Sequence, residues 1–409
     1  MRAALISALA AGAAATRPFL NEPDTGIELA LGDLAVGALS NLTQMVGLPD
    51  FEYAARNYLP IKNYTYYRNG AAGEWSYRNN LEVFGRYRLR PRTMVDITNI
   101  ESTLNTTILG HNFSAPIFIS PAARADYAHA DAELNLMRAA AAENILYMPA
   151  LYAAKTIEQI AEVKAEGQVA FQQVYLTTND TATQVLFDRI KASGANGIVY
   201  TVDSAADGNR HRAARFAVGS ADSDYSLITW DEYRKLSNMT DLPIIIKGIM
   251  TVEDAEAAIE NKVPAIILSN HGGRQLDGSP SSLEVALEIY EKDPEIFQKI
   301  EVYADGGVRY GADVLKLLSL GVKAVGLGRP IMFSNIFGQE GVEKAIQILK
   351  HEIAIDAGNL GVPDLKKIDA SYVSRDHPQC SNLEHPLTTS TGQVDPQQLV
   401  LLSIALSTR

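Results

Sequence analysis

The chain has 409 residues, of which 47% are hydrophobic and 21% charged, a globular composition with ample length for a large core. Its formal net charge of −12 argues against nucleic acid or an anionic membrane surface as a partner, so an anionic substrate would need local cations. The single cysteine, Cys380, excludes an internal disulfide, a cysteine-based zinc site and an iron–sulfur cluster. The sequence has no run of about 18 strongly apolar residues that would predict a membrane span.

Residues 1–15 differ in composition from the rest of the chain. Met1 and Arg2 precede an alanine-rich apolar stretch that ends in small residues, so a secretory signal peptide is predicted. A mitochondrial presequence is the first alternative, because no acidic residue precedes Glu22, and a cytoplasmic location is the second. Glycosylation sequons, which are consistent with secretion, begin at Asn41, Asn63, Asn105, Asn112, Asn179 and Asn238.

Residues 16–110 are predicted to form an N-terminal extension whose helices pack on the main body. Two helical segments are expected between residues 51 and 70, interrupted at Leu59-Pro60 and ended by Gly70 as a C-terminal glycine. Residues 96–109 are expected to form short strands or a hairpin. The tail at 369–409, with a short apolar helix candidate at Leu399–Leu406, is predicted to be a strap over the body or a neighbouring subunit.

Between residues 111 and 368, short apolar runs alternate with segments of helical periodicity. Strands buried on both faces need not alternate apolar and polar residues, so each run is predicted to be a strand of a parallel sheet. The runs are Pro116–Ser120, Ile145–Pro149, Val169–Tyr175, Gly197–Asp203, Pro243–Lys247, Ala265–Ser269, Glu301–Ala304 and Ala324–Gly328. Helices are expected at Ala132–Ala142, Ile157–Ala165, Val252–Ile259, Leu283–Tyr290 and Ala312–Leu320.

Eight strand–helix units over about 230 residues predict a TIM (β/α)8 barrel. A doubly wound open sheet is the alternative. It would be expected to carry a glycine-rich fingerprint after its first strand, and the residues there, Pro121 to Arg124, are not one.

Polar residues end six successive predicted strands, where barrel active sites lie. They are Gln173 and Tyr175, Thr201 and Asp203, Lys247, Ser269 and His271, Asp305, and Arg329, with Arg210 shortly after the fourth strand. A single polar strand end carries little information, because a lysine can simply extend its ammonium group to solvent. Six in succession indicate a functional site.

The segment Ser269–Gln275, with the sequence Ser-Asn-His-Gly-Gly-Arg-Gln, follows a buried strand. Its two glycines permit a sharp turn and a close backbone approach to a ligand. His271 and Arg274 then place a base beside a fixed cation, which suits removal of a proton from a carboxylate-bearing substrate. A solvated surface loop is the alternative.

Two glycine–arginine motifs follow the seventh and eighth predicted strands. They are Asp305-Gly306-Gly307-Val308-Arg309 and Gly326-Leu327-Gly328-Arg329. Exposed backbone N–H groups, bidentate guanidinium donors and the start of a helix near Gly311 are typical of a phosphate cradle. Barrels often bind phosphate at these two loops.

Taken together, these motifs resemble the FMN-dependent α-hydroxy acid oxidases and dehydrogenases, the family of glycolate oxidase, lactate oxidase and mandelate dehydrogenase. The resemblance extends from about residue 50 to about residue 370, as is usual for a single barrel with extensions. Its motifs, in chain order, are Tyr66-Tyr67 before Gly70, Gln173 and Tyr175, Thr201 and Asp203, Lys247-Gly248, Ser269–Gln275 and Asp305–Arg309.

The resemblance implies a role for each matching residue. His271 would be the catalytic base, oriented by Asp203. Arg274 and Tyr66 would hold the substrate carboxylate, with Tyr175 at its hydroxyl and Arg210 near the mouth, and Lys247 would stabilise the reduced flavin at its N1–O2 edge. The flavin would be held by Ala122, Ala123, Gln173, Thr201 and Ser269, and its phosphate by Asp305, Gly306, Gly307, Arg309, Gly328 and Arg329.

The implied activity is that of an (S)-2-hydroxy-acid oxidase, which oxidises an L-2-hydroxy acid to a 2-oxo acid through FMN and passes the electrons to O2, giving hydrogen peroxide. A soluble dehydrogenase with another electron acceptor is the first alternative. A flavin-binding barrel of another enzyme class and a non-enzymatic flavin-binding protein are the others. The expected partners are a small 2-hydroxy acid and O2 or another acceptor, and the family implies a homo-oligomer, often a tetramer. No metal, nucleic acid or membrane partner is expected.

The sequence departs from the family pattern near the flavin and the substrate. Ala122 and Ala150 stand where the family has a threonine and often a serine, so two hydrogen bonds to the flavin are in question. Tyr152 replaces a frequent tryptophan. Arg124 replaces an apolar residue, as either a third substrate cation or a surface residue. The loop after the fourth strand is shorter than usual, which argues against an active-site lid.

Overall fold

Eight parallel strands form the centre of the structure, a computed structural model that describes residues 25–219 and 225–374. They are β4 (Ile117–Ile119), β5 (Leu146–Tyr147), β6 (Phe171–Val174), β7 (Gly197–Thr201), β8 (Ile244–Ile249), β9 (Ala265–Leu268), β10 (Glu301–Asp305) and β11 (Ala324–Leu327). The sheet order is β5-β4-β11-β10-β9-β8-β7-β6, and a bridge between Tyr147 and Ala170 joins its two ends. The predicted (β/α)8 barrel is therefore confirmed, and the open sheet is excluded.

Each strand coincides with one of the predicted apolar runs. In β8, for example, all six residues are buried, because one face packs inside the barrel and the other packs under the helices. The pairing of β8 with β9 shifts register between Lys247 and Ile249. Such a bulge bends the strand and redirects side chains, and here it lies at the end of the strand that carries Lys247.

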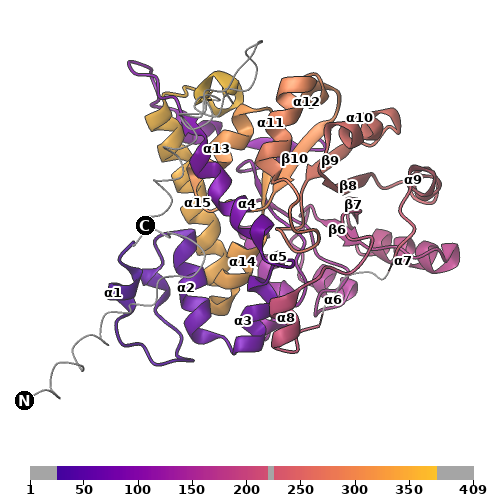
Figure 1. Cartoon of the computed structure of the whole chain (residues 1–409), viewed down its shortest axis with the longest axis horizontal. Helices are drawn as coiled ribbons and strands as arrows, with labels where there is room; N and C mark the ends of the chain where they lie inside the picture. Colours follow the sequence, from indigo (N-terminus) through magenta and orange to yellow (C-terminus); the bar gives the residue numbers. More distant parts are fainter. Residues whose placement is uncertain (1–24, 220–224, 375–409) are drawn as a thin grey trace, which may run out of the picture. The chain divides into compact units, whose positions relative to one another are not determined.

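Helices surround the barrel, and most follow the strands as predicted (Figure 1). They are α5 (Glu133–Ala142), α6 (Ile157–Glu162), α7 (Asp180–Ala192), α8 (His211–Arg215), α9 (Trp230–Ser237), α10 (Val252–Glu260), α11 (Ser282–Lys292), α12 (Ile296–Lys299), α13 (Gly311–Ser319), α14 (Arg329–Ser334) and α15 (Gly338–Leu360). The α10 start is confirmed, since the Thr251 hydroxyl accepts a hydrogen bond from the Asp254 amide at 3.1 Å. The predicted α6 is three residues too long, and no pattern in the sequence predicted the short α8.

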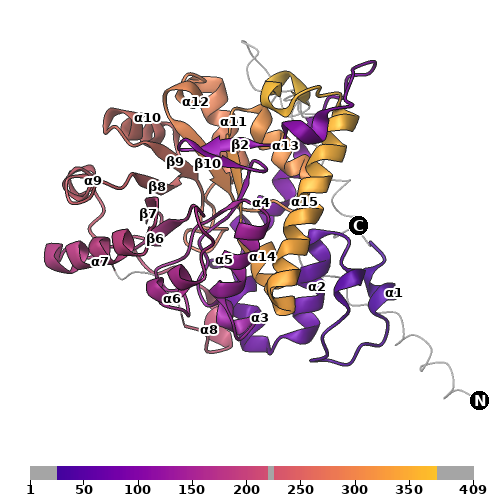
Figure 2. The same cartoon turned by 180° about the vertical axis from the view of Figure 1, so that it is seen from behind.

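The N-terminal helices are α1 (Ile27–Leu31), α2 (Leu48–Tyr58), α3 (Ile61–Arg68) and α4 (Trp75–Arg86). Both views show α2 beside α14 and α15, so this region packs against the end of the barrel sequence (Figures 1 and 2). The break at Leu59-Pro60 is confirmed. The predicted glycine cap is wrong: α3 ends with an extended Asn69, and its last turn is closed by the Asn69 side-chain amide, which donates to the Thr65 carbonyl.

A hairpin closes the N-terminal end of the barrel. It consists of β2 (Thr106–Ile108) and β3 (His111–Phe113), later in the chain than the predicted 96–109, where a 3-10 turn (Ile100–Thr103) precedes it. Ile108 and Phe113 pack among the side chains of the barrel interior. The polar residues that end the predicted strands lie at the opposite, C-terminal end of the barrel.

The described chain ends with β12 (Val373–Ser374), which pairs antiparallel with β1 (Arg88–Leu89). The predicted signal peptide at 1–15 and the helix candidate Leu399–Leu406 lie outside the described residues. Within residues 25–219 and 225–374, no helix is long and apolar enough to cross a membrane.

Candidate active site

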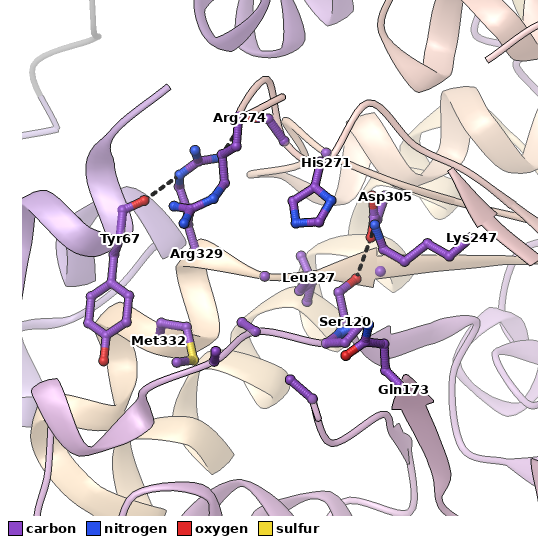
Figure 3. Close-up of a pocket in the computed structure, with 18 of the residues that line it drawn as sticks. Tyr67, Ser120, Gln173, Lys247, His271, Arg274, Asp305, Leu327, Arg329 and Met332 are labelled. Atoms are coloured by element: carbon purple, nitrogen blue, oxygen red, sulfur yellow. Dashed lines mark hydrogen bonds and ion pairs between the residues drawn. The ribbon is translucent and has the colours of Figure 1, made fainter. Parts of the chain in front are cut away.

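A pocket opens at the C-terminal ends of the barrel strands, where the predicted site residues converge (Figure 3). Asp203, Arg210 and Ser269 lie behind its wall, and each forms a hydrogen bond with a residue that lines it. The predicted residues that line it are Tyr66, Ala122, Ala123, Gln173, Tyr175, Thr201, Lys247, His271, Arg274, Asp305, Gly306, Gly307, Arg309, Gly328 and Arg329.

His271 and Asp203 form the central pair of the pocket. His271 Nδ1 lies 2.7 Å from Asp203 Oδ1, and the Asp203 side chain is fully buried. His271 has a left-handed backbone conformation, with φ of 59°, and its amide donates to the Ser269 hydroxyl at 3.0 Å. Burial lowers the pKa of His271, although Asp203 opposes that shift. The pKa of Asp203 is also lowered, because the charges of His271 and Lys247 outweigh the cost of burial.

The bulge in β8 makes room for this pair. Gly248 has φ of +112°, and a Cβ placed there would lie 2.6 Å from Asp203 Cβ, well inside contact distance. Any side chain at position 248 would therefore displace the carboxylate that orients His271.

Lys247 belongs to a buried hydrogen-bond network. Its Nζ donates to the Ser269 hydroxyl at 2.8 Å and lies 3.5 Å from Asp305 Oδ2. The Ser269 hydroxyl donates to Asp305 Oδ1 at 2.6 Å, and the Ser120 hydroxyl donates to Asp305 Oδ2 at 3.0 Å (Figure 3). The Asp305 side chain therefore points toward Lys247, although the sequence motif placed this residue in the phosphate cradle. Ser120 was missed, although it ends the first predicted strand in the same way as the other site residues.

The half-buried Arg274, with the buried Arg210 behind the wall and a tyrosine, forms the cationic end of the pocket. Arg274 Nη1 donates to the Tyr66 carbonyl at 2.8 Å, and Arg210 Nε donates to the Arg274 carbonyl at 3.0 Å. Burial lowers the pKa of Arg274, and burial together with the charge of Arg274 lowers that of Arg210 to about 9. Since desolvation penalises both charges, an anion bound between them would be favoured.

Tyrosines border the cationic end. Burial raises the pKa of Tyr66 and of Tyr175, so both phenols stay protonated and can donate hydrogen bonds. Tyr152 stacks on Tyr175 with ring centroids 5.4 Å apart and also lines the pocket.

Gln173 and Thr201 lie buried on neighbouring strands. Gln173 Nε2 donates to the Thr201 hydroxyl at 3.0 Å, and Gln173 Oε1 accepts from the Leu151 amide at 3.0 Å. These contacts fix the amide beside the loop that contains Ala150.

The glycine–arginine motifs meet at the other end of the pocket. Arg329 donates to the carbonyls of Tyr67, Asn69 and Gly272 at distances of 2.7 to 2.9 Å (Figure 3). Most of its guanidinium group therefore holds the N-terminal region to the barrel. The Arg309 amide donates to Asp313 Oδ2 at 3.0 Å, at the start of α13.

The contacts of Arg124 bear on its two predicted roles. Its Nε and Nη2 donate to the two carboxylate oxygens of Asp126 at 2.9 and 2.8 Å, and its guanidinium lies over the Tyr127 ring. Because Asp126 compensates its charge and the Arg124 side chain is 39% exposed, these contacts favour a surface residue over a third substrate cation.

The residues of this pocket fit FMN. A Cβ added at Gly328 would meet no described atom within 4 Å, so this loop leaves an open cradle beside the backbone of Gly306 and Gly307. A buried ammonium, that of Lys247, lies among the polar groups at the far end, where it could face the ring of a flavin. Among the described residues, no group of three or more His, Cys, Asp or Glu side chains could hold a metal ion.

Comparison with known proteins agrees with this arrangement. The family model of FMN-dependent dehydrogenases matches residues 55–223 and 220–375. The chain is 33% identical to 2-hydroxyacid oxidase 1 of Mus musculus over 367 residues, covering 82% of this chain and 98% of the relative. It is also 33% identical to the L-lactate dehydrogenase (cytochrome) of Wickerhamomyces anomalus, but spans only 61% of that protein.

Among solved structures, a flavocytochrome b2 mutant superimposes with a TM-score of 0.78 at 30% identity, covering 90% of this chain and 98% of that one. None of these comparisons supports the predicted secretion. They show that the chain belongs to the FMN-dependent dehydrogenase family, whose cofactor is FMN.

Proposed function

We propose that this protein oxidises an L-2-hydroxy acid to a 2-oxo acid with FMN and passes the electrons to O2, giving hydrogen peroxide. One observation carries the proposal: His271, Arg274 and Lys247 line one pocket, and Asp203 and Arg210 lie behind its wall, hydrogen-bonded to His271 and to Arg274. That pocket therefore offers a base for a proton, cations for a carboxylate and a positive charge for a reduced flavin.

The chain's own residues would act as follows. Arg274 and Arg210 bind the carboxylate of the substrate, with the phenol of Tyr66 as a further donor. Nδ1 of His271 is engaged by Asp203, so Nε2 takes the substrate proton, and Asp203 then stabilises the imidazolium. Tyr175 is a donor toward the substrate hydroxyl. FMN supplies the two-electron acceptor when it is bound.

The FMN itself would be held along the length of the pocket. Lys247, kept in place by Ser269, would stabilise negative charge on the reduced ring, and Gln173 and Thr201 would hydrogen-bond the ring. The backbones at Ala122 and Ala123, which line the pocket, would contact the same ring. The phosphate would lie on the backbone N–H groups of Gly306, Gly307 and Gly328, with the Arg309 guanidinium as its charged donor. Arg329 would add any guanidinium N–H group that is not already bonded to the three backbone carbonyls.

The similarity to 2-hydroxyacid oxidase 1 over nearly its whole length favours O2 as the acceptor. A dehydrogenase with another acceptor is the second candidate, favoured by the similarity to L-lactate dehydrogenase (cytochrome). Oxygen uptake with hydroxy acids of increasing chain length tests both the acceptor and the substrate side chain. Rapid flavin reduction without oxygen uptake would replace the oxidase with the dehydrogenase.

Anaerobic mixing with lactate, glycolate and longer 2-hydroxy acids tests the chemistry. Bleaching of the flavin is expected with at least one of them, and no bleaching with any would refute the proposal. In His271→Gln, FMN should remain bound while flavin reduction slows by several orders of magnitude. A colourless protein that cannot be reconstituted with FMN would refute any flavin-dependent function, catalytic or not.

Assembly and processing follow as lesser proposals. We infer a homotetramer, by likeness to the family, and light scattering tests its mass. Cleavage after residue 15 and glycosylation remain predictions, tested by N-terminal sequencing and mass spectrometry of the natural protein. The sequon at Asn63 is the least accessible one, because its side chain is half-buried and donates to the Tyr127 carbonyl at 3.0 Å.

A further inference from the structure

A buried carboxylate, Glu74, lies just outside the cationic end of the pocket. Only 4% of the Glu74 surface is exposed. Oε1 accepts from the Gly70 amide at 3.0 Å and from Arg212 Nε at 2.8 Å, while Oε2 accepts from Arg212 Nη2 at 2.9 Å and from Arg68 Nη1 at 3.3 Å. Burial opposes ionisation, but these donors prevail and lower the pKa of Glu74 to about 2. Glu74 is therefore a permanent anion with bidentate geometry.

This carboxylate joins the two chain segments that carry substrate-binding groups. Arg68 ends α3, two residues after Tyr66, and Arg212 lies in α8, two residues after Arg210. Both views show α8 beside α3 (Figures 1 and 2). A second link runs parallel to the first, since the Ala72 amide donates to the carbonyl of Asn209 at 2.6 Å.

The reason for such a link is electrostatic. Arg210 and Arg274 are like charges in a poorly solvated place, and the charge of Arg274 contributes to the lowered pKa of Arg210. Before a carboxylate arrives, their repulsion favours withdrawal of Arg210, which belongs to a loop and not to a barrel strand. A buried ion pair two residues away opposes that withdrawal, because separating Arg212 from Glu74 would remove two of the four hydrogen bonds that this buried carboxylate accepts.

We propose that Glu74 is a positioning residue whose bidentate pair with Arg212 holds α8 against α3, so that Arg210 is set beside Arg274 and Tyr66 before the substrate carboxylate binds. The proposal rests on the proposed function, because it assigns these three residues to the substrate anion. It predicts a loss in anion affinity and not in the chemical step.

Arg212→Met is the main test, because the Arg212 side chain is 31% exposed and its removal leaves Glu74 with Arg68 and the Gly70 amide. Glu74→Gln tests the other partner. The control is Glu158→Gln, which removes an exposed pair of the same bidentate geometry, Arg189 Nε and Nη2 at 2.9 and 3.1 Å from Glu158. Glu158 lies at the start of α6, on the outside of the barrel.

In the FMN-loaded protein, Arg212→Met is expected to raise KM for the 2-hydroxy acid and Kd for pyruvate, read from the flavin spectrum, by about tenfold. The limiting rate of flavin reduction and the Kd of FMN should change by less than about twofold, and Arg212→Lys should restore part of the loss because it keeps the charge. A lower melting temperature with unchanged KM and pyruvate Kd would mean a merely structural pair and would overturn the proposal.

Hydrogen exchange separates this proposal from the proposed function. Arg212→Met should speed exchange at 208–216 and at 70–74, including the Ala72 amide, and Glu158→Gln should not. Unchanged exchange in Arg212→Met would overturn the positioning role. A wild-type protein that binds FMN but is reduced by no 2-hydroxy acid would refute the proposed function, and the exchange result would still decide whether the pair holds α8.

Discussion

Asp203 Oδ1 lies 2.7 Å from Nδ1 of His271, and this contact determines which imidazole nitrogen remains for the substrate. The Asp203 carboxylate is fully buried, and its second oxygen has no hydrogen-bond partner among the described residues. Among the described residues, the Asp203 carboxylate therefore hydrogen-bonds only the His271 ring, whose orientation it fixes.

Asp203→Asn should reduce the rate of flavin reduction by about a thousandfold or more, because the amide can neither fix the same tautomer nor stabilise the imidazolium. FMN binding should be unchanged, since Asp203 lies behind the pocket wall. Stopped-flow reduction and an FMN titration measure the two effects. A rate within about tenfold of wild type would exclude an orienting role for Asp203.

The pH dependence follows from the lowered pKa of His271. A base must be neutral to accept a proton, so kcat/KM should be constant between the ordinary histidine value of 6.5 and the lowered pKa of Arg210, about 9, and fall on the acid side with an apparent pKa below 6.5. In Asp203→Asn, the apparent pKa of the remaining activity should be lower still, because the carboxylate that raises the pKa of His271 is gone. An acid limb above 6.5 would contradict the assignment.

The same shift has a consequence for stability. Between the ordinary pKa and the lowered folded pKa, the unfolded chain binds a proton that the folded chain does not. The contribution of His271 to stability is therefore fully present above 6.5 and is lost as pH falls toward the folded pKa. Urea unfolding of the wild type and of His271→Gln at several pH values should show that the free energy of unfolding falls less at acid pH in the variant.

Gly248→Ala should displace Asp203, because the added Cβ would lie 2.6 Å from Asp203 Cβ. Destabilisation by about 2–4 kcal/mol is expected, together with a large loss of flavin reduction. Gly110→Ala is the matched control, since φ there is +80° and an added Cβ meets no described atom within 4 Å. It should cost about 1 kcal/mol and leave reduction unchanged. Similar reduction rates in the two variants would refute the steric argument.

Arg329→Met separates a structural arginine from a phosphate ligand. Three carbonyls, those of Tyr67, Asn69 and Gly272, would lose a donor, so both the FMN-free and the FMN-loaded protein should be destabilised, by about 3 kcal/mol. Urea unfolding of the two forms makes the measurement. Destabilisation of the FMN-loaded form alone would show instead that Arg329 acts mainly on the phosphate.

The barrel could be predicted because its strands leave a local signal. A strand buried on both faces can be apolar throughout, as in Ala265–Leu268, and a polar residue after it, here Ser269, marks the functional edge. The Ser269–Gln275 segment likewise carries its chemistry in adjacent residues. The glycine cap at Gly70 was wrong because the Asn69 side chain, one residue earlier, closes the last turn of α3. The hairpin position was wrong because it depends on a contact between segments, the packing of Ile108 in the barrel interior.

The sequence by itself determined the barrel, its functional edge and the residues that meet there. Only the tertiary structure decided which way those side chains point. Asp305 turns to Lys247, Arg329 holds three carbonyls, and Glu74 joins α3 to α8. The physical reason is that a buried charge takes its direction from whichever partners can satisfy it. Those partners lie up to hundreds of residues away in the chain, and they become neighbours only when the barrel closes.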